Sequence, residues 1–296
     1  MEVLMTKLKQ ELKQEDMASG KYHLIAGLFC PFAHRAIIAR EYLGLDKHIT
    51  MDVTCPVNQE SGLDFADHEN AVDTFYGMKK LIDIYKNTDP DFNARPTVPV
   101  LVDKESKKIV NKESAEILRE FATKFKSLHA EGAGDLYPHN LRSEIDKWAD
   151  FIGNRINSAV YRIGFATEQE VYEKEFKLFF EALEQIEEHL AKNRFFLGNQ
   201  ITEVDIKFYT TMVRFDEVYF SLYKANKKRL TEYHNIWNYM KELYQTKGFG
   251  STTDFEQIKK GYYLGFGGSK TLSLTSVYPL GSDTSKWLEA HDRASL

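Results

Sequence analysis

Short apolar segments alternate with polar turns through the first 126 residues of the chain. The run YHLIAGLF, residues 22–29, has the length and composition of a strand. Cys30-Pro31 follows, and apolar residues then recur at helical spacing as far as Leu43. Further strands are predicted at 48–53, 97–103 and 109–110, and further helices at 72–85 and after the last strand. This order, β-α-β then β-β-α, predicts a four-stranded mixed sheet packed by helices.

From residue 136 onward, the apolar positions repeat almost everywhere at the spacing of a helix. One such face is formed by Leu141, Ile145, Trp148, Ile152 and Ile156. Capping boxes at 167–170 and 202–205 predict two helix starts. Segments 231–246 and 254–263 fit further helices, whereas the glycine- and serine-rich tail is expected to drape over the surface.

These patterns predict two domains with extensions at both ends. The chain begins with an arm at residues 1–20, followed by the α+β domain at 21–126 and a linker at 127–135. The all-helical domain spans residues 136–264, and a tail spans 265–296. A chain of 296 residues is long enough for two separate cores.

Composition excludes several classes of function. Hydrophobic residues make up 43% of the chain and charged residues 28%, as in ordinary soluble proteins. A net charge of -5 argues against a general nucleic-acid binder. No apolar run reaches the ~20 residues that span a membrane, and the start of the chain lacks the apolar core of a secretory signal. Two cysteines indicate a reducing cytoplasm rather than a disulfide framework.

Cys30 stands where a strand ends and a helix begins. Unpaired N–H groups and the helix dipole stabilise a thiolate there, and Pro31 suits the first helical position. The position predicts a nucleophile, with a small buried cysteine as the alternative. Ala33 replaces the second cysteine of a C-x-x-C pair, which favours a single thiol that forms a mixed disulfide with a small thiol. Cys55 is a conceivable resolving partner.

Two further stretches suit a small thiol that is built like a peptide. Val98-Pro99 precedes a strand, and a cis bond there would turn the Val98 N–H and C=O outward toward an extended ligand. Glu113-Ser114 opens a helix, where the serine and free N–H groups can hold a carboxylate and the acid an ammonium. Both charges occur on a γ-glutamyl head group. The alternatives are an ordinary trans proline at Pro99, a simple helix cap at Ser114 and a solvated acid at Glu113.

Several motifs occur together in the order of a known family. They are CPFAHR, PTVPVLVDKESKKIVNKESAEILREF, NSAVYRIGFATEQEVYE, FLGNQITEVDI and TTMVRFDEVY. From about residue 22 to 263 the chain resembles the glutathione transferase superfamily, and within it the xi class, the glutathionyl-hydroquinone reductases. The resemblance implies a thioredoxin-like N-terminal domain, an all-α C-terminal domain, a homodimer and glutathione as co-substrate. It also implies catalysis by Cys30 and glutathione binding by Val98, Glu113 and Ser114.

Other positions of the family's site are matched less closely. Leu63 stands where the family has a tryptophan beside glutathione, and it lacks the indole ring and its N–H donor. Tyr161, Tyr262 and Tyr263 match positions where the family's aromatic-substrate pocket has tyrosines. Arg95 precedes a strand, within expected reach of the thiol ligand.

The resulting hypothesis is a detoxification reaction in which Cys30 removes glutathione from a glutathionyl-hydroquinone through a mixed disulfide. A thioltransferase or dehydroascorbate reductase is one alternative. A scaffold protein that keeps the fold without catalysis is another, for which Leu63 is the best argument; a different small thiol also stays open. The expected partners are a small thiol and an aromatic conjugate, with no nucleic acid or membrane. Nine histidines without metal-ligand spacing predict no metal site.

Overall fold

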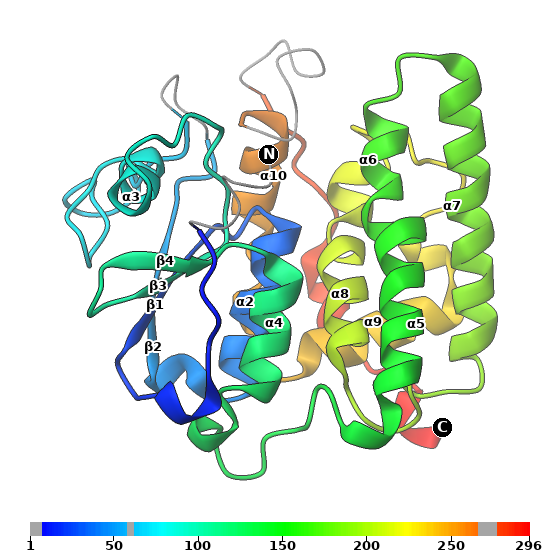
Figure 1. The fold of residues 1–296 in the computed structure, drawn as a ribbon. Coiled ribbons are helices and arrows are strands. Elements are labelled where there is room, and N and C mark those ends of the chain that lie inside the picture. Colours follow the sequence, from blue (N-terminus) through cyan, green and yellow to red (C-terminus); the bar gives the residue numbers. More distant parts are fainter. Residues whose placement is uncertain (1–7, 58–61, 266–276) are drawn as a thin grey trace. The chain divides into compact units, whose positions relative to one another are not determined.

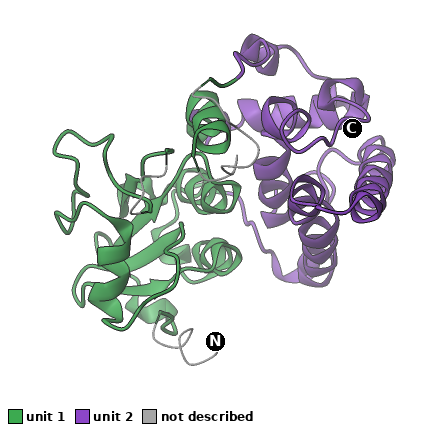
Figure 2. Ribbon diagram, turned by 90° about the horizontal axis from the view of Figure 1, so that it is seen from above, with its two compact units in different colours: residues 1–133, 252–278 green, residues 134–251, 279–296 purple. Residues whose placement is uncertain are grey.

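The computed structural model describes residues 8–57, 62–265 and 277–296, which form two compact units. Unit 1 comprises Met1–Ala133 and Thr252–Tyr278, and unit 2 comprises Gly134–Ser251 and Pro279–Leu296 (Figure 2). Each unit is therefore built from two stretches that are far apart in the sequence. The predicted arm and tail lie partly outside the described residues.

Unit 1 contains a four-stranded mixed sheet, as predicted. Its strands are β1 (Tyr22–Ala26), β2 (Ile49–Val53), β3 (Val100–Asp103) and β4 (Lys108–Asn111), in the order β2-β1-β3-β4. β1 is parallel to β2 and antiparallel to β3, and β3 is antiparallel to β4. All residues of β1 are buried, so this strand forms the centre of the unit's core.

Four α-helices of the described residues complete unit 1. They are α2 (Pro31–Tyr42), α3 (Leu81–Thr88), α4 (Ser114–Thr123) and α10 (Phe255–Tyr263). Helices α2 and α4 lie side by side and in contact (Figure 1). Since α2 directly follows β1, the N-terminus of α2 lies at the end of the central strand.

The predicted helix at 72–85 was wrong in its first half, because α3 begins only at Leu81. Asp73 accounts for the difference. Its carboxylate accepts hydrogen bonds from the backbone N–H groups of Phe75 at 3.0 Å and Met78 at 2.7 Å. These bonds, together with Gly77 at φ 72, hold a tight turn where the apolar spacing suggested a helix.

Unit 2 is helical in its described residues. Its α-helices are α5 (Arg142–Ile152), α6 (Ala159–Gly164), α7 (Gln169–Leu190), α8 (Glu203–Met212) and α9 (His234–Gln245). Short π-helical turns follow α5 at Gly153–Asn157 and α8 at Phe215–Tyr219. None of the helices in the described ranges combines the length and the apolar character that crossing a bilayer requires.

One of the two predicted capping boxes is present. At the start of α8, the Thr202 N–H donates to the Asp205 carboxylate at 2.7 Å, and the reciprocal bond completes the box. The box predicted at 167–170 was wrong. Helix α7 instead begins at Gln169 after Glu168, whose side chain makes no capping bond.

The described part of the C-terminal tail lies on the surface of unit 2, as expected, and is anchored there by the buried side chains of Trp287 and Arg293. Arg293 is 0% exposed, and its guanidinium donates to the carbonyl oxygens of Leu190 at 2.8 Å and Arg194 at 2.9 Å. The Gln245 amide on α9 donates to the Trp287 carbonyl at 3.0 Å. This anchoring could not be predicted from the sequence, because each hydrogen bond joins a side chain to a carbonyl group far away along the chain.

Helix α10 belongs to unit 1, whereas the sequence pattern predicted that residues up to 264 belong to the all-helical domain. The reason is close packing at Gly261. A Cβ atom added there would lie 2.4 Å from the Cβ of Phe29, so only glycine allows this approach. Helix α10 therefore packs directly on the segment that leads into Cys30.

We predict that Gly261→Ala lowers the free energy of unfolding by about 1–3 kcal/mol, because the new methyl group overpacks a rigid contact. Gly153→Ala is the matched control, since a Cβ at Gly153 meets no atom within 4 Å. The control should stay within about 0.5 kcal/mol of the parent protein. Denaturant unfolding measures both variants, and equal stabilities would contradict the packing argument.

Candidate active site

Cys30 occupies the cap position of α2, directly before Pro31 at the first helical position. Its N–H donates to the Gly27 carbonyl at 3.0 Å, and its own carbonyl accepts the His34 N–H at 3.0 Å. The thiol is partly exposed. Cys30 is therefore accessible at a helix N-terminus, where backbone N–H groups and the helix dipole favour a thiolate. The alternative of a sealed structural cysteine does not fit this position.

Val98 lies beside this sulfur. The Val98-Pro99 peptide bond is cis, as the sequence suggested. The Cys30 Sγ lies 3.8 Å from the Val98 carbonyl oxygen, although the two residues are separated by 68 positions in the chain. A backbone carbonyl and a thiol thus converge at the end of the sheet, ahead of β3.

The N-terminus of α4 carries Glu113 and Ser114. Glu113 is the cap residue, and its N–H donates to the Asn111 side-chain oxygen at 2.9 Å. The Glu113 carboxylate is half-exposed and forms an ion pair with Lys112 at 2.6 Å. The first amides of α4 have no acceptors within the helix, so this end of α4 can bind a carboxylate.

Arg35 connects the N-terminal ends of α2 and α4. Its Nη1 donates to the Ser114 hydroxyl at 3.4 Å, and its guanidinium lies 4.8 Å from the centre of the Phe32 ring. The side chain is only 6% exposed. Arg35 therefore adds positive charge beside Ser114 from a buried position, a role hidden in the sequence because an arginine one turn into a helix is usually on the surface.

His34 is a core residue of unit 1. It is fully buried, and its Nε2 lies 2.8 Å from the Thr252 hydroxyl. This contact fastens the segment before α10 to α2. The sequence contained no signal for the pair, because 218 positions separate its members.

Cys55 differs from Cys30 in its surroundings. It is 6% exposed, and burial raises the pKa of its thiol to about 11. Cys55 is therefore protonated at neutral pH, where a thiol is a poor nucleophile. This environment supports a passive Cys55 over a resolving one.

Leu63 and Arg95 lie in loop segments of unit 1. Leu63 is 7% exposed, and its carbonyl accepts the Leu81 N–H at 3.0 Å, where α3 begins. Arg95 lies in an exposed position before β3, although neighbouring atoms shield part of its guanidinium from water and thereby lower its pKa. Their assignment to the thiol ligand remains a prediction from the family resemblance.

The three tyrosines assigned to substrate binding are divided between the units. Tyr262 and Tyr263 belong to α10 in unit 1, where Tyr262 is 3% exposed and Tyr263 is half-buried. Tyr161 belongs to α6 in unit 2. Its ring lies 5.7 Å from that of Tyr223 and 6.1 Å from that of Tyr219.

This aromatic cluster was missed in the sequence, although a signal was present. Tyr161 is followed four residues later by Phe165, and Tyr219 by Tyr223, the spacing at which helical side chains meet. Gly164 permits the packing, since a Cβ there would lie 2.3 Å from the Tyr223 ring. Phe165 is 49% exposed, so the cluster presents an open aromatic edge.

Comparison with known proteins covers both units. The family described as "Glutathione S-transferase, N-terminal domain" matches residues 29–124, and "Glutathione S-transferase, C-terminal domain" matches residues 169–242. Glutathionyl-hydroquinone reductase YqjG of Escherichia coli is 40% identical over 263 residues, covering 88% of this chain and 79% of that protein. Glutathionyl-hydroquinone reductase PcpF of Sphingobium chlorophenolicum is 36% identical, with 88% and 83% covered.

Solved structures of glutathione transferases are similar to this chain over nearly its whole length. A xi class transferase from Natrialba magadii matches with a TM-score of 0.92 and 35% identity, over 98% of this chain and 91% of that one. Glutathione-bound YqjG matches with a TM-score of 0.88 and 38% identity, over 94% and 89%. The first unit thus has the thioredoxin-like fold expected of the N-terminal domain. The chain belongs to the glutathione transferase superfamily, in its xi class.

Proposed function

We propose that this protein is a glutathione-dependent reductase that removes glutathione from glutathionyl-hydroquinone conjugates through Cys30. The observation that carries the proposal is the partly exposed thiol at the N-terminus of α2, 3.8 Å from the Val98 carbonyl oxygen. The two relatives named as glutathionyl-hydroquinone reductases support the same activity.

The reaction proceeds in two thiol exchanges. The Cys30 thiolate attacks the sulfur of the conjugate, so a Cys30–glutathione disulfide forms and the aryl carbon–sulfur bond breaks. The aryl carbon receives a proton, which gives the free hydroquinone. A second glutathione thiolate then attacks the glutathione sulfur of the mixed disulfide, releasing glutathione disulfide and regenerating Cys30. Over the whole cycle, the thioether sulfur of the conjugate and the thiol sulfur of the second glutathione each lose one electron, and the aryl carbon gains the two electrons.

Glutathione is held, in this proposal, by the backbone of Val98 and the start of α4. Ser114 and the first amides of α4 receive the γ-glutamyl carboxylate, with Arg35 adding positive charge from behind. Glu113 exchanges its present partner, Lys112, for the ligand ammonium. The family resemblance assigns Leu63 and Arg95 to the glutathione ligand, and it assigns Tyr161, Tyr262 and Tyr263 to binding of the aromatic substrate.

Thioltransferase or dehydroascorbate reductase activity is the second candidate, because it needs the same mixed disulfide at Cys30. The choice depends on the electrophile, and the two named reductases favour the conjugate. Leu63 favours a third possibility, another small thiol in place of glutathione. We further propose a cytoplasmic location, in keeping with two cysteines that are not joined in a disulfide. A homodimer and a role in detoxification are proposed from the family resemblance.

Cys30→Ser should lower turnover of a glutathionyl-hydroquinone by roughly a thousand-fold or more, because it removes the nucleophile. Cys55→Ala is the control and should keep activity within a few-fold. Release of free quinol, followed by chromatography, measures both variants. An active Cys30→Ser enzyme would reject the covalent mechanism.

Treatment with glutathione disulfide near neutral pH should add one glutathione, on Cys30. Cys55 should stay unmodified, because the pKa of about 11 keeps its thiol protonated until the pH approaches that value. Peptide mass spectrometry locates the adduct. An unmodified Cys30 would favour the scaffold alternative, and a Cys30–Cys55 disulfide would show that Cys55 resolves the intermediate.

Ser114→Ala should raise the KM for glutathione by about ten-fold with little change in kcat, because it removes a ligand contact common to the ground and transition states. Ser127→Ala, an exposed serine outside the site, is the matched control. Steady-state kinetics with varied glutathione test the assignment. An unchanged KM would remove Ser114 from the glutathione site.

A further inference from the structure

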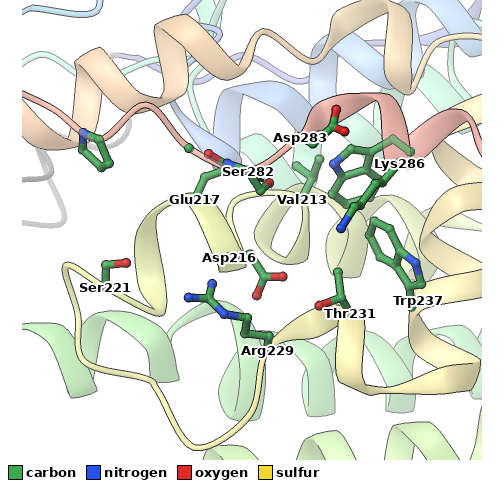
Figure 3. Close-up of a pocket in the computed structure, with 13 residues that line it drawn as sticks. Val213, Asp216, Glu217, Ser221, Arg229, Thr231, Trp237, Ser282, Asp283 and Lys286 are labelled. Carbon is green, nitrogen blue, oxygen red and sulfur yellow. Dashed lines mark hydrogen bonds between the residues drawn. The ribbon is translucent and has the colours of Figure 1, made fainter.

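A cavity of about 400 Å³ in unit 2 has charged side chains that interact with one another across its walls (Figure 3). The walls come from the helical part of unit 2 and from the C-terminal segment. Arg229 interacts electrostatically with Asp216, and Lys286 with Asp283. These charges therefore join the walls of the cavity itself. A polar cluster in unit 1 differs, because it lies at the helix end to which glutathione binding is assigned.

Asn111 is the centre of this cluster. It is the last residue of β4, and α4 begins shortly after it at Ser114. Its side chain is 0% exposed, and its oxygen accepts the Glu113 N–H at 2.9 Å in a turn that directs the chain into the helix. The Glu113 carbonyl then accepts the Ile117 N–H at 2.9 Å. Asn111 therefore fixes the residue that caps α4.

The amide nitrogen of Asn111 reaches further along α4. It donates to the Glu120 carboxylate at 3.0 Å and lies 3.3 Å from the Glu116 carboxylate. Both amide hydrogens thus have an acceptor and the amide oxygen has a donor, as a buried side chain requires. The reversed amide would turn its oxygen toward two carboxylates, so only one orientation fits. Asn111 consequently joins the end of β4 to the cap and to the second turn of α4.

The carboxylates around Asn111 have further charged neighbours. Lys9, from the N-terminal arm, forms an ion pair with Glu116 at 2.7 Å, and Lys124 interacts electrostatically with Glu120. Burial raises the pKa of Glu120 to about 7, although the hydrogen bond from Asn111 acts in the opposite direction. The ionised form of Glu120 is therefore stabilised in part by Asn111.

We propose that Asn111 is a positioning residue of the glutathione site, which sets the first turn of α4 and thereby the places of Glu113 and Ser114. The inference rests on the proposed binding of the γ-glutamyl group at this end of α4. Asn111 itself does not touch the ligand, because its polar atoms are used within the protein. Arg35 holds the same turn through its Nη1, which lies 3.4 Å from the Ser114 hydroxyl.

A reciprocal exchange of amide and carboxylate tests this role. Asn111→Asp keeps the oxygen that accepts the Glu113 N–H but places a carboxylate against Glu120. We expect the KM for glutathione to rise about ten-fold, with kcat within about two-fold of the parent enzyme. Adding Glu120→Gln restores an amide donor from the α4 side and should return the KM to within about three-fold of the parent value. Quinol release with varied glutathione is measured at pH 8, where Glu120, with a pKa of about 7, is mostly ionised.

Glu120→Ala is a milder variant that decides the outcome if Asn111→Asp does not fold. It removes an acceptor of the Asn111 amide, and the KM should rise about three-fold. Glu105→Ala, at an exposed glutamate between β3 and β4, is the matched control and should keep the parental KM. Denaturant unfolding of each variant separates the two effects, because a merely structural Asn111 would change stability without changing KM.

The inference is overturned if folded Asn111→Asp keeps the parental KM, if the double variant is as impaired as the single one, or if Glu120→Ala and Glu105→Ala behave alike. Ser114→Ala tests the glutathione site separately. A raised KM in Ser114→Ala alone would reject only the positioning role. An unchanged KM in Ser114→Ala would reject the site and the positioning role together.

Discussion

The position of one thiol depends on how the chain passes from β1 into α2. β1 is completely buried, and the turn after it closes through the hydrogen bond from the Cys30 N–H to the Gly27 carbonyl. The helix starts immediately afterwards at Pro31. The backbone of Cys30 is therefore held in place by the buried central strand, while its sulfur stays partly exposed. A nucleophile needs both properties, because it must be reachable and held in one place.

The turn is further fixed by a segment from the other end of the chain. Phe29 packs against Gly261, and the His34 ring lies within hydrogen-bond distance of the Thr252 hydroxyl, so residues after 251 support the start of α2. Although α10 lies far along the chain from the sheet, it shares the core of unit 1.

Buried polar groups explain much of the rest of the fold. Arg293 and Asp205 are both fully buried, and each has several hydrogen-bond partners from distant segments of unit 2. Burying such groups without partners would cost several kcal/mol each. Satisfying them therefore fixes the C-terminal segment at the end of α7 and fixes the start of α8.

The sequence by itself determined the sheet, the helical second half and the approximate position of most elements, because these follow from apolar spacing and turn residues within short windows. It also singled out Cys30, since a cysteine before a proline at a strand-to-helix junction is a local signal. Prediction from the sequence failed where side-chain contacts, rather than local apolar spacing, determine the structure. The Asp73 turn replaced half of a predicted helix, and Arg35 proved to be buried against Ser114.

Only the tertiary structure decided which thiol is exposed, which helix joins which core and where the tail ends. Cys30 and Cys55 carry the same side chain. Cys55 is buried, which makes its thiol inaccessible and raises its pKa, whereas Cys30 is partly exposed. The packing of α10 on Phe29 and the cavity beside Trp287 join residues that are distant along the chain. Contacts of that kind depend on shape and burial in three dimensions, which local patterns of residues do not encode.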